Sequence, residues 1–144
     1  MPNHTKTNSK TFFYYKNKDI DTTKMDLNKY LKILKLNKLD YARVCLHKNE
    51  RDKIQKMVMI FNKKYKMPFH LQKKGNVTYV HISGKGKLKF LDKKIKSISF
   101  DLNNKLINIK RNSFRSMECY SKIPLIFLEI TEGPFKQKET IWYE

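Results

Sequence analysis

Several residue types are scarce in this sequence of 144 residues. Its two cysteines, Cys45 and Cys119, are too few for a disulfide scaffold. Its four glycines form neither a G-x-x-x-x-G-K phosphate loop nor a G-x-G-x-x-G nucleotide motif. No apolar run approaches the roughly 20 residues of a membrane helix, and the first ten residues are polar, unlike a signal peptide. We therefore expect a soluble, cytoplasmic protein without a membrane span.

Arginine is scarce as well, although the chain is strongly basic. The formal net charge is +19, yet only four of the 32 basic residues are arginines. A charge of this size is typical of proteins that bind nucleic acid. Such proteins tend to grip phosphates and bases through the bidentate arginine fork, however, and the lysines here are scattered. The pattern favours a solvated lysine surface, and a basic β-domain that binds nucleic acid is an alternative hypothesis.

Short stretches with strand character fill the chain from Tyr41 onward. They are rich in β-branched and aromatic residues or alternate between apolar and polar ones, and turn signals such as Ser83-Gly84-Lys85-Gly86 separate them. Strands at this spacing are typical of an antiparallel sandwich or barrel. The predicted strands are residues 41–47, 56–61, 77–82, 87–91, 96–100, 106–110 and 124–130, the last being the most apolar and therefore central.

One helix is predicted, over residues 25–37. An apolar stripe at the helical spacing i, i+3, i+4, i+7 runs through it, and Thr23 with Asp26 has the form of a capping box before it. The stripe consists of Leu27, Tyr30, Leu31 and Leu34.

The N-terminal region precedes these elements. We expect residues 1–11 to be a flexible tail and residues 12–144 to form one domain. The aromatic run Phe12-Phe13-Tyr14-Tyr15 opens that domain. Contiguous exposed aromatics often mark an interface, so we predict a homodimer. The competing interpretation is an edge strand of the same chain.

Three stretches together carry a family resemblance. In chain order they are Arg43-Val44-Cys45-Leu46-His47, then Tyr65-Lys66-Met67-Pro68-Phe69-His70, and then the segment from Phe127 to Phe135 with its Gly133-Pro134-Phe135 end. This order, followed by Trp142, resembles the WbuC-family cupin-fold proteins, which are found with bacterial O-antigen and capsule biosynthesis genes. The resemblance implies an all-β, cupin-like antiparallel barrel or sandwich (jelly roll) with one short N-terminal helix.

The resemblance also implies where a metal would bind. In the family pattern, histidines and a carboxylate converge inside the barrel on a divalent metal. The corresponding positions here read Phe69, Leu71, Asn76 and Phe114-Arg115. Phenylalanine, leucine and arginine offer a metal no lone pair, so we predict no metal and no other cofactor. A weaker alternative is a cupin metalloenzyme with a site rearranged around His70 and His81, together with His47.

A barrel-mouth pocket is the remaining candidate site. The family's ligands come from segments that correspond to residues 68–80 and 111–117, so the resemblance implies a pocket lined by His70, Asn76, Tyr79, His81, Phe114 and Arg115. If Arg115 points inward, it needs Glu118, Glu129 or an anionic ligand as its partner. We therefore expect a divergent protein of a surface-polysaccharide pathway that binds, or once processed, a sugar or nucleotide-sugar. Whether it is an enzyme stays open at this point.

Overall fold

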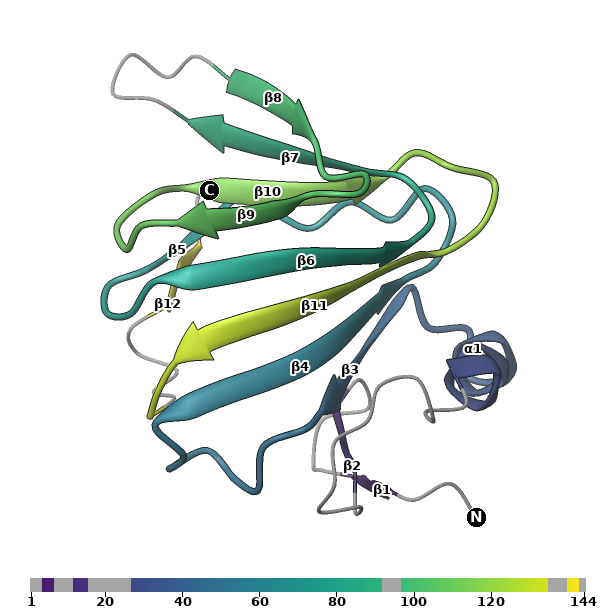
Figure 1. The fold of residues 1–144 in the computed structure, drawn as a ribbon. Coiled ribbons are helices and arrows are strands. Elements are labelled where there is room, and N and C mark those ends of the chain that lie inside the picture. Colours follow the sequence, from purple (N-terminus) through teal and green to yellow (C-terminus); the bar gives the residue numbers. More distant parts are fainter. Residues whose placement is uncertain (1–3, 7–11, 16–26, 92–96, 135–139, 143–144) are drawn as a thin grey trace.

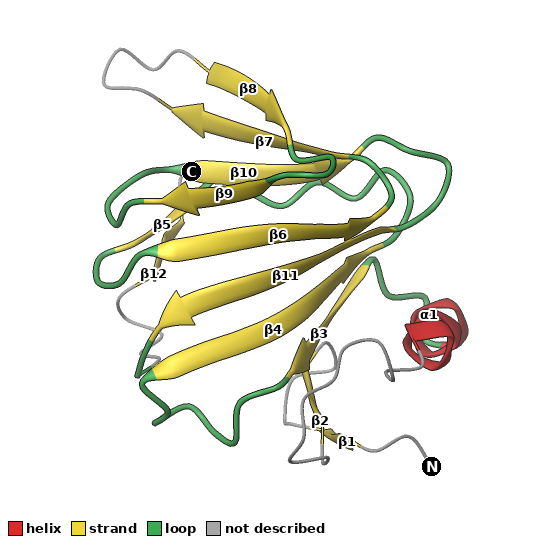
Figure 2. Ribbon diagram, viewed as in Figure 1, coloured by secondary structure: helices red, strands yellow, loops and turns green. Residues whose placement is uncertain are grey.

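The computed structural model describes residues 4–6, 12–15, 27–91, 97–134 and 140–142. Two β-sheets face each other, and one helix lies outside them (Figure 1, Figure 2). Sheet A contains, in spatial order, His4–Lys6 (β1), Phe12–Tyr15 (β2), Tyr41–Cys45 (β3), Ile54–Phe61 (β4), Leu125–Glu132 (β11), Val77–Ser83 (β6) and Leu106–Ile109 (β9). Sheet B contains Thr140–Trp142 (β12), His70–Gln72 (β5), Arg115–Cys119 (β10), Gly86–Leu91 (β7) and Ser97–Asp101 (β8).

The strand pattern predicted from the sequence is confirmed. Every predicted strand is present, with ends that differ by no more than two residues. The most apolar one, β11, lies between β4 and β6 near the middle of sheet A, as predicted. Neighbouring strands are antiparallel, except that β2 pairs with β3 in parallel. The sequence pattern does not predict β1, β5, β10 and β12.

The main hydrophobic core lies between the two sheets. Phe127 of β11 is at its centre, with its ring edge-on to Phe61 of β4 at 5.1 Å and to Tyr79 of β6 at 5.2 Å. Leu88 of β7 and Met117 of β10 complete it from sheet B. We call the face that each sheet turns toward the other its interior face. Since side chains alternate along a strand, these residues fix which side chains of each strand point inward.

The predicted N-terminal helix is also confirmed. It spans Leu27–Leu36 (α1), and the residues of the predicted capping box before it lie outside the described part of the chain. Tyr30 and Leu34 are buried against the outer face of sheet A, where Val44 and Ile60 lie. The helix therefore covers one side of sheet A and leaves the space between the sheets to the strands.

Two N-terminal strands extend the edge of sheet A. The aromatic run predicted at an interface forms β2, which pairs through its backbone with β3 of the same chain, and β1 adds to β2. The homodimer stays a prediction. Of the predicted tail, residues 4–6 form β1 and the rest lie outside the described residues. Within the described residues, no helix combines the length and the apolar character that crossing a membrane requires.

Candidate functional site

Arg115 is the most unusual residue between the sheets. It opens β10, where it pairs with His70 of β5 on one side and Phe90 of β7 on the other. Its side chain points inward and is only 1% exposed. Nε donates a hydrogen bond to the Tyr79 hydroxyl at 3.1 Å, and Nη1 donates a longer one of 3.5 Å to the carbonyl of Ser113. Nη2 is buried without a hydrogen-bond partner among the described residues.

Acidic and hydroxyl groups of sheet A face Arg115. Tyr79 of β6 lies directly across from Glu129 of β11 in the strand register. Thr131, two residues further along β11, donates its hydroxyl hydrogen to Glu129 Oε1 at 3.3 Å. All three side chains are buried. We call Arg115, Tyr79, Glu129 and Thr131, together with His70, the Arg115 cluster.

The protonation of this cluster follows from burial and neighbouring charge. Burial raises the pKa of Tyr79 to about 12, against the opposing effect of Arg115, so its phenol stays neutral. Burial acts to lower the pKa of Arg115, but the interactions with Tyr79 and then Glu129 outweigh it and raise that pKa. The guanidinium is therefore positively charged at any physiological pH.

His70 lies beside this charge and is itself neutral. Burial first, and then the positive charge of Arg115, lower the pKa of the His70 imidazole to about 4. Nδ1 lies 3.0 Å from the carbonyl oxygen of Pro68. Since a carbonyl only accepts hydrogen bonds, Nδ1 carries the proton and Nε2 holds the lone pair.

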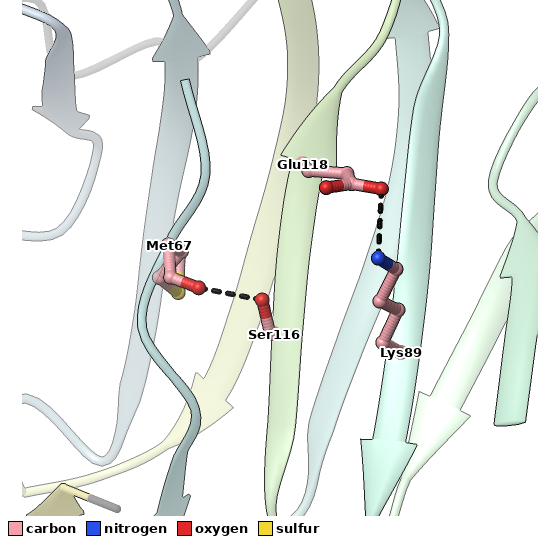
Figure 3. Close-up of polar contacts among 4 residues, drawn as sticks. All are labelled: Met67, Lys89, Ser116 and Glu118. Atoms are coloured by element: carbon pink, nitrogen blue, oxygen red, sulfur yellow. Dashed lines mark hydrogen bonds and ion pairs between the residues drawn. The ribbon is translucent and has the colours of Figure 1, made fainter. Parts of the chain in front are cut away.

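Glu118 is not the carboxylate that faces Arg115. Because side chains alternate along β10, Ser116 and Glu118 point away from the interior. Glu118 forms an ion pair with Lys89 of β7 at 3.1 Å, and the Ser116 hydroxyl donates to the carbonyl oxygen of Met67 at 2.5 Å (Figure 3). Of the two carboxylates considered from the sequence, the interior one is Glu129.

The other predicted pocket residues lie outside this cluster. His81 ties two turns together, since its Nε2 donates to the carbonyl of Gly84 at 2.6 Å and its Nδ1 accepts from the backbone N–H of Asn104 at 3.1 Å. Asn76 is exposed, and its side-chain oxygen accepts from the backbone N–H of Arg111 at 3.2 Å. Phe114 is half-buried, and its carbonyl accepts from the N–H of Leu91 at 3.1 Å. The structure thus brings together His70, Tyr79 and Arg115 of the predicted set.

The interior residues do not fit a divalent metal. No group of three or more His, Cys, Asp or Glu side chains among the described residues is arranged to hold one. His47 Nδ1 lies 3.0 Å from the backbone carbonyl oxygen of Lys56 and 3.1 Å from its backbone nitrogen, and both ring nitrogens of His81 contact backbone groups of turns. His70 alone of the three faces the interior cluster, where the Arg115 charge would repel a metal cation.

The strand register around β5 differs from the one that the resemblance implies. His70 is on the interior face, since its ring lies 4.9 Å from that of Trp142 and its strand partner is Arg115. Alternation therefore places Leu71 on the opposite face, not at an interior ligand position. Phe69 precedes β5 and is half-buried.

Two residues near the cluster have no place in the pocket predicted from the sequence. The charge of Arg43, on the interior face of β3, affects the pKa values of both His70 and Tyr79. Trp142 lies on β12 and contacts His70. Arg43 could have been found from its alternation with Tyr41 and Cys45, whereas a three-residue strand such as β12 leaves no periodic signal.

Comparison with known proteins identifies the fold of this chain. No protein-family model matches the sequence, and no curated protein matches it. The structure is similar to the capsular polysaccharide assembling protein CapF from Staphylococcus aureus, with a TM-score of 0.62 and 17% identity over 72% of this chain and 31% of that one. It is also similar to oxalate decarboxylase from Bacillus subtilis, with a TM-score of 0.56 and 17% identity over 63% of this chain and 24% of that one.

A recombinant oxalate oxidase is similar as well, with a TM-score of 0.56 and 11% identity over 62% of this chain and 46% of that one. The chain thus spans less than half the length of each of these proteins. Identities this low carry the fold and not the activity. The structural neighbours are cupin-fold proteins, and the chain has the antiparallel jelly-roll architecture predicted for it, with one short helix.

Proposed function

We propose that this chain is a metal-free cupin-fold binding protein of a bacterial surface-polysaccharide pathway, and that it takes a sugar or nucleotide-sugar through an anionic group at Arg115. The observation that carries the proposal is Nη2 of Arg115, a buried charged donor without a partner among the described residues. Leaving such a donor unpaired costs about 1–3 kcal/mol, which a bound anion would offset. The likeness to a capsular polysaccharide assembling protein supports the pathway.

The chemistry of the cluster supports an anion over a metal. Within the cluster, Arg115 contributes one positive charge and Glu129 one negative charge, while His70 and Tyr79 are neutral, and Arg43 on β3 adds a second positive charge beside it. A guanidinium binds carboxylate and phosphate oxygens in a planar, two-pronged geometry. Charge and hydrogen-bonding capacity therefore both favour a negatively charged ligand group.

Thermal unfolding in the presence of nucleotide-sugars tests the proposal. At a ligand concentration ten times Kd, binding to the folded state adds about 1.4 kcal/mol and raises Tm by about 4 °C. Arg115→Met should abolish this rise, because it removes the charge and keeps a long, apolar side chain. Arg111→Met, at an exposed arginine, is the matched control and should keep it.

Two outcomes would contradict the proposal. If no nucleotide-sugar at millimolar concentration shifts Tm, the anion site is wrong, and a shift that survives Arg115→Met places the site elsewhere. Elemental analysis of the purified protein provides a separate check. A near-stoichiometric transition metal that is lost on His70→Ala would favour the rearranged metalloenzyme instead.

A further inference from the structure

The outer face of sheet A is covered over only part of its width. Tyr30 and Leu34 of α1 pack on this face at β3, β4 and the start of β11. Figure 1 shows α1 beside β3, at a distance from β6 and β9. Of the described residues, only those of α1 are helical. The outer side of β6 and β9 therefore has no helix over it.

One row of apolar side chains crosses this face from the covered half to the uncovered half. In the strand register, Val44 of β3 lies beside Val58 of β4, followed by Leu128 of β11, Val80 of β6 and Leu106 of β9. Val44 and Val58 are 0% and 1% exposed, whereas Leu106 is 61% exposed. The row stays apolar where the helix ends, so its uncovered half has the composition of a buried surface.

The uncovered half also lacks charge, and we call the outward side chains of β11, β6 and β9 the apolar face. The outward positions of β6 and β9, and those of β11 as far as Ile130, include no ionisable side chain, although 31% of the chain is charged. Their polar residues Thr78 and Asn108 are hydrogen-bonded to each other at 2.6 Å. Contiguous exposed apolar side chains of this kind mark an interaction surface.

Two opposite charges stand at one end of the apolar face. Glu132 is the last residue of β11, Lys110 directly follows β9, and both are exposed. Because side chains alternate along a strand, both point outward. Thr131 pairs with Val77, and Val77 pairs with Ile109, so Glu132 and Lys110 lie at the same level along the strands, two strands apart.

This arrangement is complementary to itself. A two-fold axis that runs parallel to the strands, over β6, reverses the order of the strands between two facing copies and keeps each residue at its level. β9 of one copy then faces β11 of the other, with Leu106 opposite Leu128. At the charged end, Lys110 faces Glu132 of the other copy, and the reverse pair forms by symmetry. Sheets that pack face to face keep their strands nearly aligned, as this axis requires.

We propose that the apolar face binds a second copy of this chain in a two-fold dimer, with Lys110 of each copy paired with Glu132 of the other. This surface is distinct from β2, where the aromatic run predicted an interface. It is three strands wide, about 14 Å by about 20 Å, which is small for a permanent dimer. We therefore expect a reversible dimer with a Kd on the order of 10 μM.

Sedimentation equilibrium of the full chain, from about 1 to about 100 μM in about 0.15 M sodium chloride, tests the surface. Leu106→Asp should weaken the dimer by at least about tenfold, because it puts a charge into the apolar contact. Leu36→Asp is the matched control, since Leu36 is an 82% exposed leucine at the end of α1 and the change in charge is the same. It should leave Kd within about threefold of the wild type.

Exchange of the two charges tests the orientation. Lys110→Glu and Glu132→Lys each place like charges opposite one another twice in the dimer, so each should raise Kd by about tenfold. The double variant restores both pairs at the net charge of the wild type and should return Kd to within about threefold. Circular dichroism confirms that each variant is folded.

Three results would overturn the proposal. A dimer that survives Leu106→Asp would place the contact on another surface. A dimer that Leu106→Asp breaks but the double charge variant does not restore would overturn the pairing of Lys110 with Glu132. A wild type that stays monomeric over the whole range would exclude the second copy, and its co-sedimentation with phosphatidylglycerol vesicles, lost in Leu106→Asp, would assign the apolar face to an anionic membrane instead.

Discussion

At the scale of single residues, the energetics of Arg115 set this interior apart from an ordinary core. A buried guanidinium loses its hydration, and here only two hydrogen bonds among the described residues, one of them long, replace it. Well-packed apolar side chains often replace buried charges at no cost or with a gain in stability. Tyr79 and Glu129 offset this loss enough to raise the pKa of Arg115, but Nη2 has no hydrogen-bond partner among the described residues, and the proposed anionic ligand would supply one.

His70 should make the stability of the fold depend on pH. Its pKa is about 4 in the folded state and 6.5 in the unfolded reference, mainly because of burial and the charge of Arg115. Between these values the unfolded chain holds a proton at this site that the folded chain does not. Stability is therefore complete above about pH 6.5 and falls as the pH drops toward 4, by on the order of 3 kcal/mol.

Urea unfolding of the wild type and His70→Gln at several pH values between 7 and 4 measures this effect. Glutamine is polar, close in size and does not titrate, so the variant should lose less stability across the window than the wild type does. Other groups titrate in both proteins and cancel in the comparison. Parallel profiles for the two proteins would show that the folded-state pKa of His70 is not depressed.

At the scale of elements, a strand is best predicted from the sequence where one pattern of apolar and polar residues runs through its whole length. Residues 124–130 are apolar enough to mark a central strand, and β11 occupies that place. β5 has only three residues, so no period can be recognised. β10 begins with Arg115 and Ser116, both polar and both buried, which hides its alternation.

These unpredicted strands decide the geometry of the candidate site. The sequence suggests His70, Tyr79 and Arg115 as pocket residues, but the pairing of β5 with β10 sets His70 beside Arg115. The direction of each side chain depends on a register that a shift of one residue reverses. This is why Leu71 seems from the sequence to hold an interior position that His70 occupies in the structure.

The turn between β6 and β7 should depend strictly on Gly84. Its φ of +76° lies in the left-handed region, and a Cβ there would meet the carbonyl oxygen of Pro124 and lie 2.8 Å from Leu125 Cα. Both obstacles are backbone atoms, which cannot rotate away. Gly84→Ala should therefore lower the free energy of unfolding by more than about 1 kcal/mol.

Urea denaturation of this variant beside Lys85→Ala measures the effect. Lys85 is exposed and lies in the same turn, so its substitution should change stability by no more than about 0.5 kcal/mol. Equal stability of Gly84→Ala and the wild type would mean that the turn relaxes into a different conformation.

At the scale of the whole molecule, the two sheets separate an apolar interior from a basic exterior. The Arg115 cluster is a group of buried polar side chains within this interior, whereas many of the lysines are exposed. An excess of exposed positive charge attracts anions without selecting among them. Binding at the Arg115 cluster must therefore be measured at an ionic strength high enough to suppress this background.

The same excess charge should make the fold more stable as salt is added. With 32 basic and 13 acidic residues, repulsion between like charges dominates, and it is stronger in the compact state than in the expanded unfolded chain. The Debye length shortens from about 30 Å at 0.01 M to about 10 Å at 0.1 M salt, which screens this repulsion. Tm should thus rise by several degrees over this range of sodium chloride, as followed by circular dichroism.

Arg115→Met changes one charge in a large excess, so its Tm should rise with salt at nearly the same slope. A slope that vanishes in this variant would assign the effect to anion binding at the Arg115 cluster. A Tm that falls with salt would instead mean that attractive ion pairs, such as Lys89 with Glu118, outweigh the repulsion.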